Sequence, residues 1–179
     1  MHRRTLTLGL WLLVTVVSVA CATPPSSTPI APGGDWHEFE GTWTASGTRH
    51  VLALGDGRVG ATIELEGTML LAGPGRPGVG FRSEAVALVD SASGLTGRCV
   101  WTDENGDQVF SELTGTGTAA RNRMEGKFVG GTGRYAGATG SYEFSWQYMI
   151  ESEDGRISGR AVELKGRVRT GAPPAGNAP

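Results

Sequence analysis

Apolar and polar side chains alternate with a period of two along most of the chain after residue 35. The clearest run is Tyr142–Glu151, in which Glu143 and Ser145 separate aromatic residues, and the pattern recurs in Ile63–Leu71 and Val162–Val168. This period predicts β-strands with one buried and one solvated face, as in an antiparallel sheet. Since no stretch keeps the i, i+3, i+4, i+7 apolar spacing over three turns, we expect no long helix.

Glycine-containing turns separate these runs. Asn105-Gly106 is the strongest hairpin signal, because both central residues of a type I′ turn need a positive φ. Asp154-Gly155 is a second signal of the same kind, and Gly55-Asp56-Gly57 and Gly73–Gly78 mark further turns. The runs are Phe39–Ser46, His50–Leu54, Val59–Leu71, Gly80–Val89, Gly97–Asp103, Gln108–Thr114, Met124–Val129, Tyr142–Glu151 and Ile157–Val168.

Successive hairpins at this spacing predict an antiparallel meander of about eight strands. Such a sheet avoids exposed edges by closing on itself. The predicted fold is therefore all-β, a closed or nearly closed eight-stranded antiparallel barrel.

The interior of a barrel of this size is either filled by side chains or holds one small ligand. Small residues on the inner wall would leave a cavity, whereas the aromatic residues opposite them would fill it, and the sequence leaves both possibilities open. The small residues are Ala85, Ala87, Gly115, Gly117, Gly159 and Ala161. The candidate ligand-binding residues are Trp101, Phe110, Tyr142, Phe144, Trp146 and Tyr148.

The first twenty residues have the layout of a secretory signal peptide. Basic residues at Arg3 and Arg4 precede an apolar run, Leu6–Val19, that closes on the small residue Ala20. This run is shorter than the roughly 20 residues that a membrane-spanning helix needs. The sequence predicts export, through either the general route or, if Arg3-Arg4 is a twin-arginine signal, the twin-arginine route.

Ser18-Val19-Ala20-Cys21 resembles the lipobox of bacterial lipoproteins. The resemblance implies that a diacylglyceryl group is attached to Cys21 and that cleavage leaves this cysteine first. Ser18 departs from the pattern, because the first lipobox position is usually Leu. The expectation is lipidation at Cys21 and a place in the cell envelope, on an inner or an outer membrane. Ordinary cleavage after Ala20 or Ala22, which would give a soluble secreted protein, is the alternative.

The amino-acid composition divides the rest of the chain into a tether, a folded domain and a tail. Residues 21–34 are rich in Pro, Ser and Thr and predict a disordered, partly extended tether. Residues 35–170 are long enough for one domain with one core. Residues 171–179 share the composition of the tether and predict a disordered tail.

Charge limits the choice of partners. The whole chain has 16 Lys and Arg against 18 Asp and Glu, and loss of Arg3 and Arg4 with the signal peptide changes the net charge from −2 to −4. A mildly acidic domain without a basic run does not favour nucleic acid as a partner. We therefore expect membrane contact through the lipid on Cys21, and a homo-oligomer remains possible.

Candidate chemistry is sparse. Cys99 would have no disulfide partner if Cys21 is acylated, and a lone cysteine here favours a small buried residue over a nucleophile. His37 and His50 have no cysteine or second histidine at the spacing typical of metal ligands. The sequence also lacks the Gly-x-Ser-x-Gly motif that would indicate a hydrolase. The sequence predicts neither a metal nor a cofactor.

Glu112 is the best candidate for a catalytic group. The phase of Val109–Thr114 is ambiguous: either Val109 and Leu113 face inward, or Phe110 and Glu112 do. In the second case a carboxylate would lie in an apolar barrel, where burial raises its pKa and suits it to acid–base catalysis. In the first case Glu112 is a solvated surface residue.

The segment Gly130–Gly140 is the most distinctive motif. Gly131, Gly133 and Ala136 fit a dinucleotide-binding fingerprint, but that fingerprint needs a helix after it, and a strand-like run follows instead. With Phe128 before it and Tyr142–Ile150 after it, the segment resembles a loop of the allene oxide cyclase and dirigent protein superfamily. The residues that carry the resemblance, and that we expect to pack the backbone at one barrel end, are Gly131, Gly133, Arg134, Tyr135, Gly137 and Gly140.

The resemblance is specific over residues 124–148 and looser over residues 35–169. It implies an eight-stranded barrel with an apolar cavity, often in an oligomer, acting on small apolar molecules by confining them. It supplies no catalytic residue that can be matched to this chain. Three functions remain open: a lipid-tethered barrel that binds an apolar ligand, a cyclase or isomerase acting by confinement, and a structural or protein-interaction module.

Overall fold

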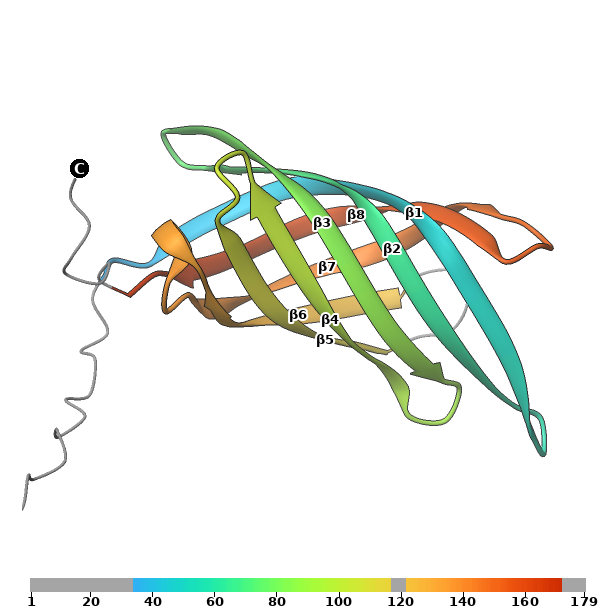
Figure 1. Cartoon of the computed structure of the whole chain (residues 1–179). Helices are drawn as coiled ribbons and strands as arrows, with labels where there is room; N and C mark the ends of the chain where they lie inside the picture. Colours follow the sequence, from blue (N-terminus) through green and yellow to red (C-terminus); the bar gives the residue numbers. More distant parts are fainter. Residues whose placement is uncertain (1–33, 117–121, 172–179) are drawn as a thin grey trace, which may run out of the picture.

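A computed structural model of the protein describes residues 34–116 and 122–171, except for the side chains of residues 76 and 77. It contains eight strands and one short 3₁₀ helix (Figure 1). In chain order they are β1 (His37–Gly55), β2 (Arg58–Gly73), β3 (Arg76–Asp90), β4 (Gly94–Asp103), β5 (Gln108–Thr116), β6 (Asn122–Gly131), η1 (Gly133–Tyr135), β7 (Thr139–Glu151) and β8 (Arg156–Arg169). The predicted signal peptide, Cys21, the tether up to residue 33, Gly117 and residues 172–179 lie outside the described residues.

The strands form one closed barrel in which each strand pairs antiparallel with the next and β8 pairs with β1. This confirms the predicted all-β, eight-stranded antiparallel barrel. One detail was wrong: Phe39–Ser46 and His50–Leu54 are parts of the single strand β1. Gly47 between them is not a turn residue. A Cβ on Gly47 would overlap the carbonyl of Glu64 on β2, so glycine allows the close approach that keeps the pairing continuous.

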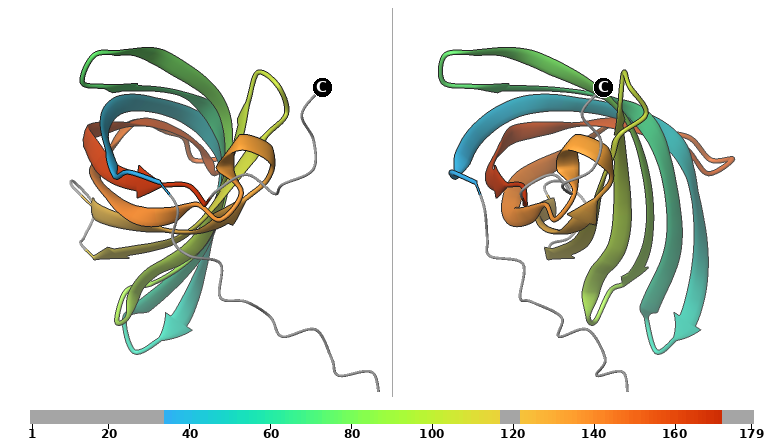
Figure 2. Two further views of the ribbon diagram at one scale, coloured as in Figure 1. Left: turned by 90° about the vertical axis from the view of Figure 1, so that its left-hand side faces the viewer. Right: turned by 60° about the vertical axis from the view of Figure 1, so that its left-hand side comes forward.

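The two barrel ends differ. The connections β1–β2, β3–β4 and β7–β8 lie at one end, which we call the far end. The turns β2–β3 and β4–β5, the helix η1 and both termini of the described domain lie at the other, which we call the η1 end (Figure 2). At the far end the β1–β2 and β7–β8 hairpins project past the barrel and diverge from each other (Figure 1).

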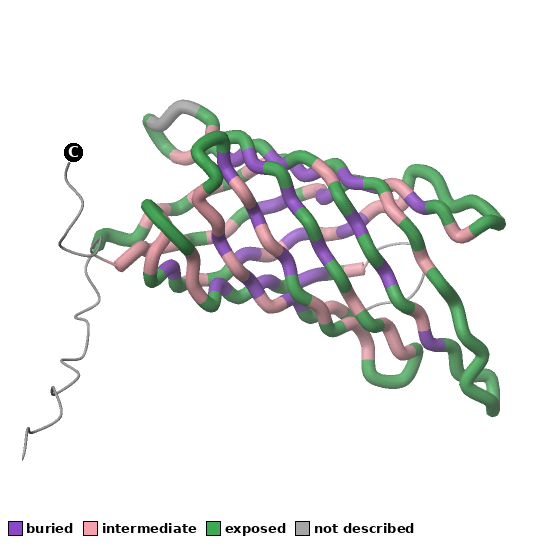
Figure 3. Tube along the Cα trace, viewed as in Figure 1, coloured by how far each residue is buried: buried purple, intermediate pink, exposed green. Residues whose placement is uncertain are grey.

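Burial alternates along each strand, as the sequence pattern predicts (Figure 3). In β7, Tyr142, Phe144 and Trp146 are buried, while Glu143 and Ser145 between them are more accessible. One face of every strand therefore contributes to a single core inside the barrel.

Aromatic rings in this core lie on glycines of neighbouring strands. A Cβ on Gly126 of β6 would overlap the ring of Tyr142, and a Cβ on Gly159 of β8 would lie 2.6 Å from the ring of Trp146. The glycines thus give the large rings room against the wall. At these two positions the small wall residues therefore leave no space inside the barrel.

Candidate functional site

The η1 end of the barrel interior is filled by aromatic side chains. The ring of Trp101 lies 5.2 Å from Phe128, 4.8 Å from Tyr142 and 6.0 Å from Phe81, measured between centroids. Tyr135 of η1 extends the cluster, with its ring 5.7 Å from Phe81. Edge-to-face and tilted pairs at these separations are favourable, so this half of the interior is a packed core.

Two pairs of polar side chains in this core bond to each other, whereas the buried hydroxyl of Ser83 has no partner among the described residues. Trp101 Nε1 donates to Cys99 Sγ at 3.1 Å, and the hydroxyls of Ser111 and Tyr142 lie 2.8 Å apart. Burial raises the pKa of the Cys99 thiol to about 12 and raises the pKa of Tyr142 well above its usual value. Both groups are therefore neutral at physiological pH, and Cys99 has no thiolate character.

A small cavity remains nearer the far end, with a volume of about 40 Å³. It is lined by Trp43, Ile63, Leu65, Ala85, Ala87, Leu95, Leu113, Asn122, Met124, Phe144, Trp146 and Tyr148. A cavity of about 150 Å³ is known to accept benzene, whereas one water needs about 10–15 Å³. The cavity as it stands accepts water-sized molecules, and a larger ligand lies fully inside it only if part of the wall moves.

Two buried polar atoms on this lining have no hydrogen-bond partner among the described residues: the indole nitrogen Nε1 of Trp43 and the amide oxygen Oδ1 of Asn122. Trp43 is only 3% exposed. An unpaired buried donor and acceptor are uncommon and each needs an explanation, such as a bound molecule. The cavity is thus an apolar space bordered by one free donor and one free acceptor.

Five of the six predicted ligand-binding residues face the interior. Trp101 and Tyr142 belong to the filled half, and Phe144, Trp146 and Tyr148 line the cavity. The sixth, Phe110, does not: it lies on the outer face of β5 and is half-buried there. Its placement in the interior was wrong.

Glu112 is also on the outer face, because β5 adopts the first of its two possible phases. Val109, Ser111 and Leu113 are buried. This phase buries two apolar side chains and gives Ser111 its bond to Tyr142, while Glu112 stays in solvent. The carboxylate pairs with Arg98 on β4 at 3.0 Å. Of the two phases that the sequence leaves open, the structure has the one in which Glu112 is a surface residue, so this carboxylate is not a buried acid–base group.

An ion pair that the sequence did not reveal closes the η1 end. The carboxylate of Asp103, which is fully buried, lies 2.5 Å from the guanidinium of Arg134. Its Oδ1 also accepts from the backbone N–H groups of Asn105 and Asp107, at 2.8 and 3.0 Å. The available signal was the position of Asp103 two residues before Asn105-Gly106, where an Asp side chain commonly bonds the turn backbone.

The electrostatics of this end follow from the same contacts. Burial alone would raise the pKa of Asp103, but the two N–H donors and the charge of Arg134 outweigh it and hold the pKa below its usual value. The pKa of Tyr135 shifts upward instead, because burial raises it to about 12. The guanidinium of Arg134 lies 5.1 Å from the ring centroid of Tyr135. Arg134 and Tyr135 thus connect η1 to the barrel end.

Each glycine of the segment Gly130–Gly140 is required by a different local contact or backbone angle. Gly133 has φ of 48°, and a Cβ there would overlap the carboxylate of Asp107. Gly140 has φ of 137° and would overlap the carbonyl of Arg167. Gly137 has φ of 68°, and Gly131 fits closely between β5 and Tyr135. A strand follows the segment where a dinucleotide site needs a helix.

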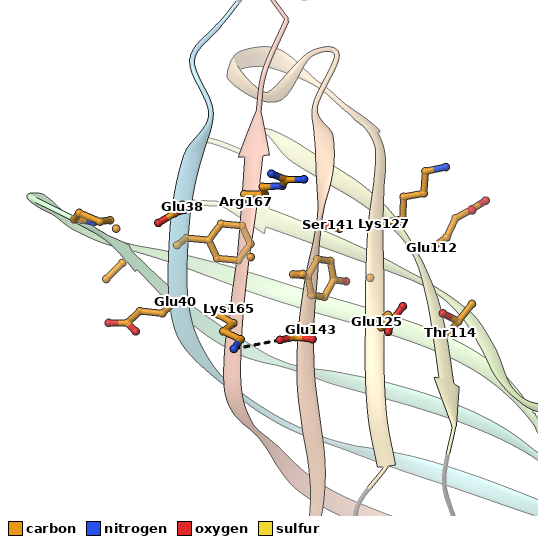
Figure 4. A pocket seen from close by; sticks show the side chains of 17 residues that line it. Glu38, Glu40, Glu112, Thr114, Glu125, Lys127, Ser141, Glu143, Lys165 and Arg167 are labelled. Atoms are coloured by element: carbon orange, nitrogen blue, oxygen red, sulfur yellow. Dashed lines mark ion pairs between the residues drawn. The ribbon is translucent and has the colours of Figure 1, made fainter.

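A larger groove of about 980 Å³ crosses the outer faces of β1 and β5–β8 (Figure 4). Charged side chains of both signs line it: Glu38, Glu40, Glu112, Glu125, Glu143, Lys127, Lys165 and Arg167. Lys165 pairs with Glu143 at 3.2 Å, and Arg123 also contacts Glu143. Hydrogen bonds from Lys165 and Arg123 lower the pKa of Glu143. Phe39 and Tyr142 also border the groove, but none of the described residues that line it has a buried polar atom without a partner.

Within residues 34–116 and 122–171, no group of three or more His, Cys, Asp or Glu side chains has the geometry to hold a metal ion. The same residues contain no helix long and apolar enough to cross a membrane.

Comparison with known proteins gives a structural likeness. No family model and no curated protein matches the chain. Among solved structures, it is similar to the pterocarpan synthase dirigent protein GePTS1, at 13% identity and a TM-score of 0.48 over 82% of this chain and 92% of that one. The assignment of an eight-stranded barrel rests on the strand pairing of this chain itself.

Proposed function

We propose that this protein is a bacterial envelope lipoprotein whose barrel binds a small apolar ligand in the far-end cavity. One observation carries the binding proposal: an apolar lining that includes a buried donor on Trp43 and a buried acceptor on Asn122, neither of which has a partner within residues 34–116 and 122–171. A mostly apolar ligand with one polar group, such as a hydroxyl or a carbonyl, would satisfy them. Preformed sites of this kind combine apolar walls with a few placed polar groups.

Met124 is the part of the wall best suited to admit such a ligand. Its side chain is buried, borders the cavity, and lies over Gly115, where a Cβ would be 3.0 Å from the methionine methyl. Methionine is unbranched and flexible, so it changes rotamer at low cost. Movement of Met124 would enlarge the cavity beyond its 40 Å³ without moving the backbone.

The test measures the thermal unfolding midpoint of the protein with and without benzyl alcohol, which is apolar apart from one hydroxyl. A ligand that binds only the folded state raises the midpoint. We expect a rise for the wild type and a larger one for Met124→Ala, which widens the cavity. Met149→Ala is the matched control, because Met149 is 54% exposed and does not border the cavity.

A midpoint that benzyl alcohol leaves unchanged in both the wild type and Met124→Ala would contradict the binding proposal. Native mass spectrometry of the protein isolated from its own host gives an independent measurement. We expect a bound small molecule, and its loss in a Trp43→Phe variant that keeps the ring packing but removes the donor.

A second candidate function, a structural or protein-interaction module, is supported by the filled η1 half of the interior. The cyclase or isomerase alternative receives no comparable support. Among the described residues, Asp103 is the buried carboxylate, and Arg134 and the β4–β5 turn occupy it.

A further inference from the structure

The projecting β1–β2 hairpin has a free edge. β1 pairs with β2 as far as Gly55, but its pairing with β8 ends at Thr48. Beyond that point one further bond reaches the β8 side, from the N–H of Arg49 to the carbonyl of Gly155 at 2.7 Å. The β7–β8 hairpin then diverges from β1 (Figure 1). Among the described strands, residues 50–54 of β1 consequently have a neighbour on one side only, and these residues are exposed.

The direction of the free backbone groups follows from the Arg49 bond. In an antiparallel ladder the N–H and C=O of one residue point to the same side, and successive residues alternate. Since Arg49 points away from β2, Val51 and Ala53 do too. The free edge therefore presents four backbone groups, the N–H and C=O of each of these two residues.

Apolar side chains surround this edge. Val51 is 48% exposed, Leu52 50% and Leu54 49%. An exposed apolar strand edge is a template for pairing with another strand, and soluble proteins usually protect such edges with charges or proline. The stretch His50–Leu54 contains no Lys, Arg, Asp, Glu or Pro.

We propose that this edge pairs with the same edge of a second copy of the chain, antiparallel and with the two-fold axis at Leu52. Val51 of each copy then lies opposite Ala53 of the other, and the four free groups of each edge form four inter-chain hydrogen bonds. Leu52 lies opposite its own counterpart in a non-hydrogen-bonded pair, whose Cα atoms are about 4.5 Å apart.

A second copy fits this edge because the stretch is self-complementary. Val51, Leu52 and Ala53 meet apolar residues, Leu54 meets His50, and no like charges oppose each other across the axis. A two-fold contact also closes on itself, so it gives dimers and not fibres. Four hydrogen bonds and a few apolar side chains form less than the roughly 1,200–2,000 Å² of a stable interface, so the dimer is weak and depends on concentration.

Cysteine cross-linking tests the register in the full-length protein. Leu52→Cys places two thiols at a separation that suits a disulfide, for which Cα atoms lie about 4.4–6.8 Å apart. Val51→Cys is the matched control, because two copies of residue 51 are offset along the strands beyond the ~7 Å limit. Under mild oxidation we expect a disulfide-linked dimer from Leu52→Cys and its loss in Val51→Cys. Equal cross-linking of both variants, or none from either, overturns the proposal.

A second substitution separates edge pairing from random collision. Ala53→Pro removes an N–H that points to the free edge, so it leaves the pairing of β1 with β2 intact. In the Leu52→Cys background we expect Ala53→Pro to abolish the cross-link while the thermal unfolding midpoint stays near that of Leu52→Cys alone. An undiminished cross-link overturns the proposal. This test is independent of the proposed function, because the edges can pair even if the barrel binds no ligand and Cys21 carries no lipid.

Discussion

At Gly126 the lack of a side chain lets the ring of Tyr142 lie against β6. Alanine there would force a Cβ into the ring, and overpacking of this kind costs about 1–3 kcal/mol. We expect Gly126→Ala to lower the free energy of unfolding by that amount in a denaturant titration. Gly80→Ala is the control, since a Cβ on Gly80 meets no atom within 4 Å. A Gly126→Ala variant as stable as Gly80→Ala would show that Tyr142 does not need the glycine.

Asp103 makes stability depend on pH. Its folded-state pKa is depressed, so the stability it contributes is present above the unfolded-state pKa of about 3.9 and is lost as pH falls through the folded-state value. We expect the wild type to be more stable than Asp103→Asn at pH 7, and the difference in unfolding free energy to shrink below about pH 4. Denaturant titrations of both proteins at pH 7 and below pH 4 measure this difference. A difference that does not change with pH would exclude this role.

At the scale of elements, η1 closes one barrel end through the ring of Tyr135 on Phe81. Full truncation of a buried aromatic residue costs about 3–5 kcal/mol, so we expect about 2 kcal/mol for the half-buried Tyr135→Ala. Amide hydrogen exchange in β3 and β4 near Phe81 and Trp101 should accelerate. Tyr135→Phe keeps the ring and should leave that exchange nearly unchanged. Equal exchange in all three proteins would mean that Tyr135 does not cover this end.

The sequence was sufficient for the strands, because turn residues and period-two alternation are local properties. It left the phase of Gln108–Thr114 open, since Val109 with Leu113 and Phe110 with Glu112 are both plausible inner pairs. Long-range contacts settle that choice, namely the Ser111 bond to Tyr142 and the Glu112 pair with Arg98. A bulge between Phe110 and Ser111 in the pairing with β6 is likewise invisible in the local pattern.

The sequence predicted most of the residues that face the barrel interior, but not how much empty space they leave. Five of six aromatic candidates face inward because alternation assigns faces correctly. Whether glycines on the wall leave space depends on which ring lies over them, as Trp146 does over Gly159, and that requires the inter-strand register. The unpaired atoms of Trp43 and Asn122 could not be predicted either, because the sequence does not show which side chains lie within hydrogen-bond distance of them in the packed barrel.

For the whole molecule, the proposed anchor predicts where the protein is found. We expect the full chain to remain with the membrane fraction and Cys21→Ala to move to the soluble fraction, because the two acyl chains of a diacylglyceryl group suffice for stable anchoring, whereas the variant has none. Cys99→Ala is the control, since Cys99 is buried in the barrel and should not affect fractionation. Fractionation with immunodetection measures both. Retention of Cys21→Ala in the membrane would contradict lipidation as the anchor.

The placement of both domain termini at the η1 end has a mechanical consequence. A pull on the N-terminal side of β1, opposed by a load on its hairpin tip at the far end, acts along the strand. The ladder bonds between β1 and its neighbours β2 and β8 run perpendicular to that direction, so many of them share the load at once. A barrel held from this terminus would resist extension in shear, whereas a pull that separated β7 from β8 from their open end, at Thr139 and Arg169, would break the bonds one pair at a time.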